Sequence, residues 1–102
     1  MSKYIINEKA LDDINKIWIY TEENWSEEQA DRYYNLIFDE IDYIVSNFEM
    51  ARDFKNIRKN YKYSKVKSHN IFFKKTKAKE IEIIKIIHKR KRTNNYILIM
   101  NI

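Results

Sequence analysis

The sequence predicts an α+β domain in which a short first strand and two helices precede a small, mainly antiparallel twisted sheet. In the first half of the chain, apolar residues recur at three- and four-residue steps, as on one face of a helix. The second half contains alternating or continuous apolar runs, which favour strands. The resulting order β-α-α-β-β-β indicates helices packed on a sheet. A chain of 102 residues can bury a core of its own, so we expect one domain over residues 1–102.

The first half contains signals for a strand and an αα-hairpin. Residues 3–6 (KYII) are a strand candidate, and Asn7 can cap the following helix. Asp12 and Asp13 lie in or just after its first turn, where the helix dipole favours acidic groups. Its apolar face consists of Leu11, Ile14, Ile17, Trp18 and Thr21, with Trp25 at the exit. We expect this face to pack on a second helix and on the sheet.

The second helix begins with a capping-box pattern. Ser26 is the expected cap, and Gln29 is expected to reach back to it. The apolar stripe of this helix contains Ala30, Tyr33, Tyr34, Ile37, Ile41, Ile44, Val45 and Phe48. The connection between the helices is very short, so they are predicted to be antiparallel neighbours.

The second half predicts three strands after a loop. Residues 47–60 lose clean periodicity, which indicates a loop that contains at most one helical turn. Strands are expected over residues 61–68, 70–75 and 80–88, with a hairpin turn at 76–79. The last of them is apolar on both faces, which suits a central strand. Tyr96–Met100 is either a further strand or an arm that packs on a partner.

Composition excludes several classes of site. The chain has no glycine, so a Gly-rich phosphate loop is excluded, and no cysteine, so disulfides and thiolate zinc sites are excluded. Its turns must therefore use Asn, Asp, Ser and Lys, and Asn60 suits a left-handed conformation. We expect no cofactor. The chain shows no leader-like segment and no apolar run of membrane-spanning length, so we expect a soluble cytoplasmic protein.

The charges divide the chain into two opposite halves. Residues 1–50 hold 4 Lys and Arg against 12 Asp and Glu, a net of −8. Residues 51–102 hold 16 Lys and Arg against 3 Asp and Glu, a net of +13. This asymmetry indicates an anionic partner for the second half. Mutual attraction of the two halves on folding is an equally good partial explanation.

Two histidines mark one end of the predicted sheet. His69 opens one strand and His88 closes the next, so antiparallel pairing would bring the imidazoles close together. The simplest interpretation is a hydrogen bond from each ring to backbone or hydroxyl groups. Alternatively, with Arg90, Arg92 and Tyr96 they could grip phosphate or exchange protons. A triad that uses Ser68 is disfavoured, because Ser68 and His69 would face opposite sides of a strand. A metal site at the two histidines is disfavoured because it needs an acidic third ligand, and Glu80 and Glu82 are the only glutamates in this half of the chain.

A basic run follows the last strand. Lys89, Arg90, Lys91 and Arg92 are flanked by Tyr96, and Arg58, Lys59, Tyr61 and Lys62 form a similar mixture upstream. Lysines that neutralise phosphates beside rings that stack on bases suit RNA. The same residues suit an acidic protein segment, and the pattern does not separate the two.

Several motifs together resemble one family of proteins. The chain is similar to the RelE/ParE superfamily of bacterial type II toxins, and to its ParE branch more than its RelE branch. The resemblance spans nearly the whole chain and is strongest at residues 68–74 (SHNIFFK), similar to "SH-x-IFYR", and 84–90 (IKIIHKR), similar to "RILHxR". The resemblance also includes three segments earlier in the chain: residues 4–10 (YIINEKA), 12–18 (DDINKIW) and 25–30 (WSEEQA) with Tyr33.

Three positions depart from the family pattern. Glu49-Met50-Ala51 stands where members commonly have a proline and a glycine, and Asn60 replaces the glycine before a tyrosine. Lys91-Arg92 replaces the usual Met-Asp after the second histidine motif, which adds positive charge.

The resemblance implies a toxin held inactive in a heteromeric complex with a cognate antitoxin. ParE-like members poison DNA gyrase without being enzymes, whereas RelE-like members cut mRNA on the ribosome. The first is the expectation here; the alternatives are an mRNA endoribonuclease and a non-toxic basic binding domain. For a nuclease the available catalytic groups are His88, Arg58, Arg90 and Tyr96. The expected target- or antitoxin-binding residues are Arg58, Tyr61, His69, Phe73, His88, Arg90 and Arg92, and none is expected to bind a metal.

Overall fold

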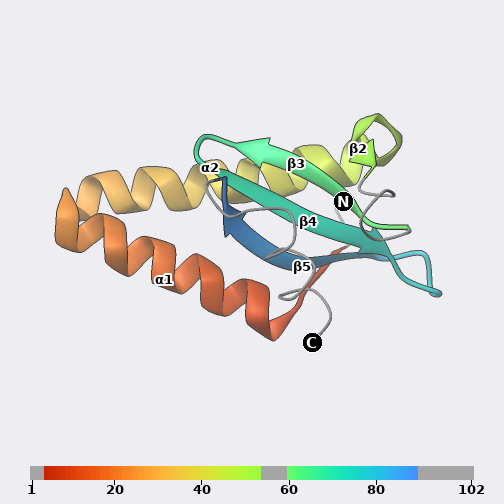
Figure 1. Cartoon of the computed structure of the whole chain (residues 1–102), viewed down its shortest axis with the longest axis horizontal. Helices are drawn as coiled ribbons and strands as arrows, with labels where there is room; N and C mark the ends of the chain where they lie inside the picture. The colour runs from red at the N-terminus through yellow and green to blue at the C-terminus, as the bar shows by residue number, and fades with distance from the viewer. Residues whose placement is uncertain (1–3, 54–59, 90–102) are drawn as a thin grey trace.

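The structure is a computed structural model, and it describes residues 4–53 and 60–89. Two helices lie side by side on one face of a five-stranded sheet (Figure 1). The elements in chain order are β1 (Tyr4–Ile6), α1 (Glu8–Asn24), α2 (Glu27–Ser46), the 3₁₀ turn η1 (Phe48–Met50), β2 (Arg52–Asp53), β3 (Lys62–Val66), β4 (His69–Lys75) and β5 (Ile81–His88). The predicted α+β class and element order are confirmed.

The sheet has the strand order β1-β5-β4-β3-β2. β1 pairs with β5 in parallel, and all other neighbours are antiparallel. β5 therefore lies inside the sheet, as its two apolar faces predicted. The strand β2 was missed, since two exposed residues carry no strand signal of their own. The expected segment Tyr96–Met100 lies outside the described residues.

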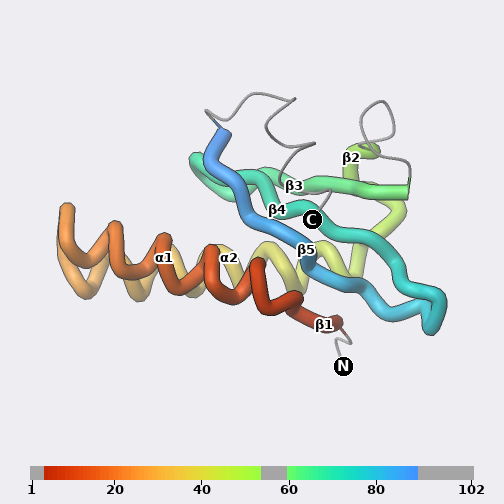
Figure 2. Tube along the Cα trace, turned by 60° about the horizontal axis from the view of Figure 1, so that its bottom comes forward, coloured from red at the N-terminus to blue at the C-terminus, as the bar shows by residue number. Residues whose placement is uncertain are grey.

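Both helices begin where the sequence predicted. The Asn7 side chain accepts a hydrogen bond from Lys9 N, and Ser26 accepts one from Gln29 N. The predicted hydrogen bond from the Gln29 side chain back to Ser26 is wrong, because the Gln29 side-chain oxygen instead accepts a hydrogen bond from Arg32 Nη1 at 3.3 Å. The two helices pack against each other, α1 on β5 and α2 on β3 (Figure 2).

The core lies between the helices and the sheet. Most of its buried residues are isoleucines. Its buried members are Ala10, Ile14, Ile37, Ile41, Ile44, Val66, Ile71, Phe73, Ile81, Ile83 and Ile86. Tyr34 of the stripe predicted for α2 is 39% exposed. In α1, Leu11 of the predicted packing face is 44% exposed and Trp25 at the exit is 66% exposed. Both lie off the narrow stripe of α1 that contacts the sheet, because the buried stripe is centred on Ala10 and Ile14.

A bulge in β5 decides which of its residues face the helices. Phe73 is opposite Ile83 and Phe72 is opposite Lys85, so Ile84 is an extra residue. Strict alternation would therefore put Ile83 and Ile86 on opposite faces, yet both are in the core beneath the helices. Ile87 instead joins a second cluster with Tyr61 and Phe72, on the other face of the sheet. The bulge explains the doubled isoleucines in residues 81–88 (IEIIKIIH).

A side chain of α1 pairs with the backbone of β5 beyond the point where β1 ends. β1 pairs only as far as Ile83, and the backbone N–H of Ile86 donates instead to Asp13 Oδ2 at 3.0 Å. The other oxygen of Asp13 binds Lys85 Nζ at 3.0 Å, and both side chains are largely buried. Asp13, which the sequence analysis assigned to the helix dipole, thus joins α1 to the sheet.

We predict that Asp13→Ala lowers the free energy of unfolding by about 2 kcal/mol, because it leaves both a backbone N–H and a largely buried ammonium without their partner. Urea unfolding measures this effect. The matched control is Asp12→Ala, which removes an exposed ion pair with Lys16 and should cost no more than about 0.5 kcal/mol. Equal losses in the two variants would contradict the role given to Asp13.

Candidate partner-binding groove

The two predicted histidines lie directly opposite each other at one end of the sheet. His69 and His88 are cross-strand partners in the β4–β5 ladder, and their ring centroids are 5.1 Å apart with the ring planes nearly perpendicular. His69 shares the face of Ile71 and Phe73, and His88 shares the face of Ile86, so both rings lie on the side of the helices. The predicted proximity of the histidines is confirmed.

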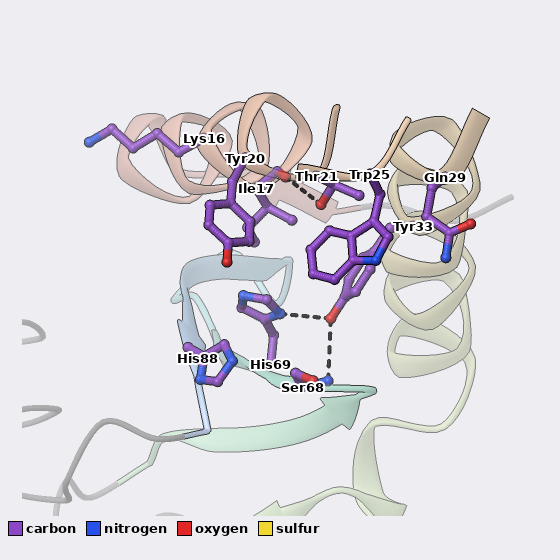
Figure 3. Close-up of a pocket in the computed structure, with 10 residues that line it drawn as sticks. All are labelled: Lys16, Ile17, Tyr20, Thr21, Trp25, Gln29, Tyr33, Ser68, His69 and His88. Carbon is purple, nitrogen blue, oxygen red and sulfur yellow. Dashed lines mark hydrogen bonds between the residues drawn. The ribbon is translucent and has the colours of Figure 1, made fainter. Parts of the chain in front are cut away.

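Tyr33 of α2 connects the helices to this pair. Its hydroxyl lies 2.7 Å from Nδ1 of His69, accepts the backbone N–H of Ser68 at 3.3 Å, and lies 3.3 Å from the carbonyl of Val66 (Figure 3). The contact with Nδ1 is the shortest, so we assign the hydroxyl proton to it. In that arrangement the neutral imidazole carries its own proton on Nε2. The histidine is thereby held in one orientation.

The environment favours the neutral form of His69. Burial, together with the smaller effect of the neighbouring His88, lowers the pKa of His69 from 6.5 to about 4. Burial also raises the pKa of Tyr33, an effect that the hydrogen bond from the Ser68 backbone partly offsets. Near neutral pH both groups are uncharged, and His69 is a poor acceptor for a proton in transit.

A groove of about 610 Å³ opens above the histidine pair. The αα-hairpin extends past the end of the sheet, so that α1 and α2 overhang the ends of β4 and β5 (Figures 1 and 2). The groove is lined by aromatic and polar side chains from both layers: Lys16, Ile17, Tyr20, Thr21, Trp25, Gln29, Tyr33, Ser68, His69 and His88. The rings of Tyr20 and Trp25 extend from the helices toward the sheet, with their centroids 6.2 Å apart (Figure 3).

The groove differs from the predicted site in its composition. Trp25 was interpreted as an exit residue and Tyr33 as a packing residue, and Tyr20 was not singled out, because helical periodicity does not show that the hairpin overhangs the sheet. Ser68 was expected to face away from His69, but it lies in the turn between β3 and β4 and lines the same groove. The alternation of a strand therefore does not apply to it.

The other predicted site residues lie elsewhere. Phe73 has no exposed surface and belongs to the core, so its side chain supports the sheet instead of facing a partner. Tyr61 is 9% exposed on the opposite face of the sheet, where Lys74 Nζ lies 5.5 Å from its ring centroid. Arg58, Arg90, Arg92 and Tyr96 lie outside the described residues.

Two further observations bear on chemistry and location. Over residues 4–53 and 60–89, no group of three or more His, Asp or Glu side chains is placed to hold a metal ion. Within the same residues, no helix is long and apolar enough to cross a membrane. The groove is lined mainly by rings and hydroxyls, with the ammonium group of Lys16.

The fold and the histidine motifs together define a toxin of the RelE/ParE superfamily. Residues 4–93 match the family model described as the ParE toxin of the type II toxin–antitoxin system parDE. The chain belongs to this family, and so to the ParE branch that its motifs indicated.

Similar proteins agree with this assignment. The chain is 27% identical over 89 residues to Toxin ParE1 of Mycobacterium tuberculosis, covering 87% of this chain and 91% of that protein. It is 30% identical over 88 residues to Toxin ParE1 of Caulobacter vibrioides, covering 86% and 90%. Among solved structures, a chain of the chromosomal ParDE system from P. aeruginosa has a TM-score of 0.74 at 17% identity, over 86% of this chain and 96% of that one. That likeness shows a shared fold.

We predict that Tyr33→Phe raises the pKa of His69, because the neutral ring loses a hydrogen-bond donor at Nδ1. The same change should lower the free energy of unfolding by about 1 kcal/mol. NMR titration of the His69 ring and urea unfolding measure the two effects. Tyr34→Phe, one position along α2 and facing another side, is the control. An unchanged His69 pKa would contradict the assigned proton position.

We also predict that the protein loses stability as the pH falls from about 6.5 to about 4. In this range unfolded His69 binds a proton that the folded residue does not, so the unfolded state is favoured at lower pH. Urea unfolding at several pH values should show the slope, and His69→Gln should reduce it. Parallel slopes in the two proteins would show that carboxylates alone cause the loss.

Proposed function

We propose that this toxin inhibits DNA gyrase in the cytoplasm by binding it, without catalysing a reaction of its own. Its membership of the ParE family supports this target. The observation that carries the non-enzymatic part is the state of His69, which is desolvated, neutral and hydrogen-bonded to Tyr33. A group with a pKa near 4 is poorly matched to proton transfer near neutral pH. An uncharged ring also holds a phosphate less strongly than a charged one.

We propose that the groove above the histidine pair is a contact surface for a protein. One wall belongs to α1 and α2, which hold 11 Asp and Glu against 3 Lys and Arg. The other wall belongs to residues 60–89, which hold 9 Lys against 2 Glu. The side chains that line the groove itself are mostly rings and hydroxyls, with Lys16 as their one charged group. Exposed aromatic rings among polar groups suit a protein segment. His69, His88 and Trp25 are the contact residues we assign.

The proposed partners are gyrase as target and a cognate antitoxin as inhibitor. The solved ParDE system, whose toxin fold this chain shares, supports a heteromeric toxin–antitoxin complex. Arg58, Arg90 and Arg92 remain proposed contacts of the target or the antitoxin, since their basic charge suits an acidic segment. The net charge of +13 in residues 51–102 favours a second candidate function, ribosome-dependent cleavage of mRNA.

We predict that the purified protein stops supercoiling by gyrase and traps cleaved DNA, and that primer extension on translated mRNA shows no cuts. The opposite result is that the mRNA is cut, that the cuts disappear in His88→Ala and that supercoiling is unaffected. It would show that the ribosome, and not gyrase, is the target.

The groove is tested in the same assays with Trp25→Ala. We expect this variant to lose at least about tenfold either in gyrase inhibition or in neutralisation by the cognate antitoxin, as for an aromatic side chain at the centre of an interface. Tyr43→Ala is the control, because Tyr43 is similarly exposed on α2 but does not line the groove. Full activity and full neutralisation of Trp25→Ala would exclude the groove as a contact surface.

A further inference from the structure

The face of the sheet that lies away from the helices has a buried apolar cluster. We call this side of the sheet the outer face; its cluster consists of Tyr61, Phe72 and Ile87, with Tyr63 and Ile84 packed against them. Both helices lie on the opposite side of the sheet (Figures 1 and 2). Every strand among residues 4–53 and 60–89 belongs to the sheet itself. No helix or strand of these residues therefore covers the outer face.

The burial of this cluster requires a second layer. Phe72 has no exposed surface, and only 4% of Ile87 is exposed. The neighbouring strands supply contacts from the side, such as Tyr63, whose ring centroid lies 5.9 Å from that of Phe72. Side chains on one face of a sheet stand roughly perpendicular to it, however, so they leave the tops of their central members open to solvent. The full burial of Phe72 therefore indicates apolar atoms above the sheet.

Two of the segments outside the described residues join the sheet far from Ile87. Residues 1–3 precede β1, which pairs with the first residues of β5. Residues 54–59 connect β2 to the start of β3, and their only apolar side chains are those of Phe54 and Ile57. Neither segment offers a continuous apolar surface to the whole cluster.

The C-terminal segment has both the composition and the reach. Residues 96–100 (YILIM) are apolar without a break. Lys89 is held at the end of the sheet, where its backbone N–H donates to the turn before β4 at 2.8 Å. The chain from Lys89 to Tyr96 can span about 23 Å when extended. Phe72 is opposite a residue four positions before Lys89 in β5, which is about 14 Å along the strand.

We propose that residues 96–100 fold back over the outer face of their own chain and form the second layer above Tyr61, Phe72 and Ile87. We call them the C-terminal strap. Packing of this apolar run on aromatic rings is favourable, because it removes the apolar surface of both from water. The same run left in solvent would promote pairing of strands between molecules. The proposal does not depend on the target of the toxin.

The C-terminal strap also fixes the basic run at residues 89–92 at both ends. One end is the hydrogen bond of Lys89 N, and the other is the strap on the outer face. Arg90 and Arg92, proposed above as contacts, are then presented at the end of the sheet beside the histidine groove. This consequence alone rests on the proposed function.

Disulfide trapping tests the position of the strap, because the chain has no cysteine of its own. Ile97→Cys, Leu98→Cys and Ile99→Cys are each combined with Tyr63→Cys on the outer face. The matched control combines each of them with Ile19→Cys, on a solvent-exposed part of α1. Under mild oxidation, at least one pair with Tyr63→Cys should form a disulfide within one chain at least about tenfold faster than its control, because the strap raises the effective concentration of the two thiols. Non-reducing electrophoresis and mass spectrometry measure the rates and separate bonds within a chain from bonds between chains.

The double variant Ile97→Ser, Leu98→Ser tests whether the strap stabilises the fold. We expect a lower urea midpoint and brighter fluorescence of a dye that binds exposed apolar surface, because the outer face loses part of its cover. Two adjacent residues are changed so that both sides of an extended segment are affected. Asn95→Ser, just before the strap, is the control and should leave both readings unchanged.

Three results would overturn the proposal. Disulfides formed only between chains would make a second copy of the chain the source of the layer. Equal rates for the pairs with Tyr63→Cys and with Ile19→Cys would show that the segment has no fixed place on the outer face. A urea midpoint that is unchanged in the double variant would show that the segment buries nothing there.

Discussion

The ladder between β4 and β5 is the constraint on which the rest of the structure depends. Its bulge at Ile84 puts Ile81, Ile83 and Ile86 beneath the helices and Ile87 on the other face. Without the extra residue, the last part of β5 would present its side chains to the wrong layers, because the pleat alternates strictly. The same ladder sets His69 opposite His88 and turns both rings toward the hairpin. The register of the β4–β5 ladder therefore sets both the packing of the core and the position of the histidine pair.

Charge separation gives the two layers different roles. The helices are acidic and the described part of the sheet is basic, so their attraction favours the packing of one on the other. Most of this charge stays exposed, however, and only a few pairs such as Asp13 with Lys85 are largely buried between the layers. The toxin thus offers an acidic helical face and a mixed groove to its surroundings. Surfaces of such different sign suit different partners.

The histidine pair illustrates how environment decides between catalysis and binding. A histidine at a sheet end beside basic residues suits acid–base chemistry as far as residue types go. Tyr33 and the overhanging helices remove His69 from water, and the neutral ring becomes part of the floor of a groove. This environment supports the proposed role of the pair as a contact surface.

Local chemistry was enough to determine the elements of this protein apart from the short strand β2. The caps at Asn7 and Ser26, the helical stripes, the strands and the left-handed Asn60 all depend on neighbours in the chain, so they could be read from it. The pairing of His69 with His88 followed from the hairpin. Only the tertiary structure decided the bulge at Ile84, the bond from Ile86 N to Asp13 and the overhang that brings Tyr20, Trp25 and Tyr33 to the histidines. These features depend on how far the helices extend past the sheet and which flank they present, and periodicity carries no information about either.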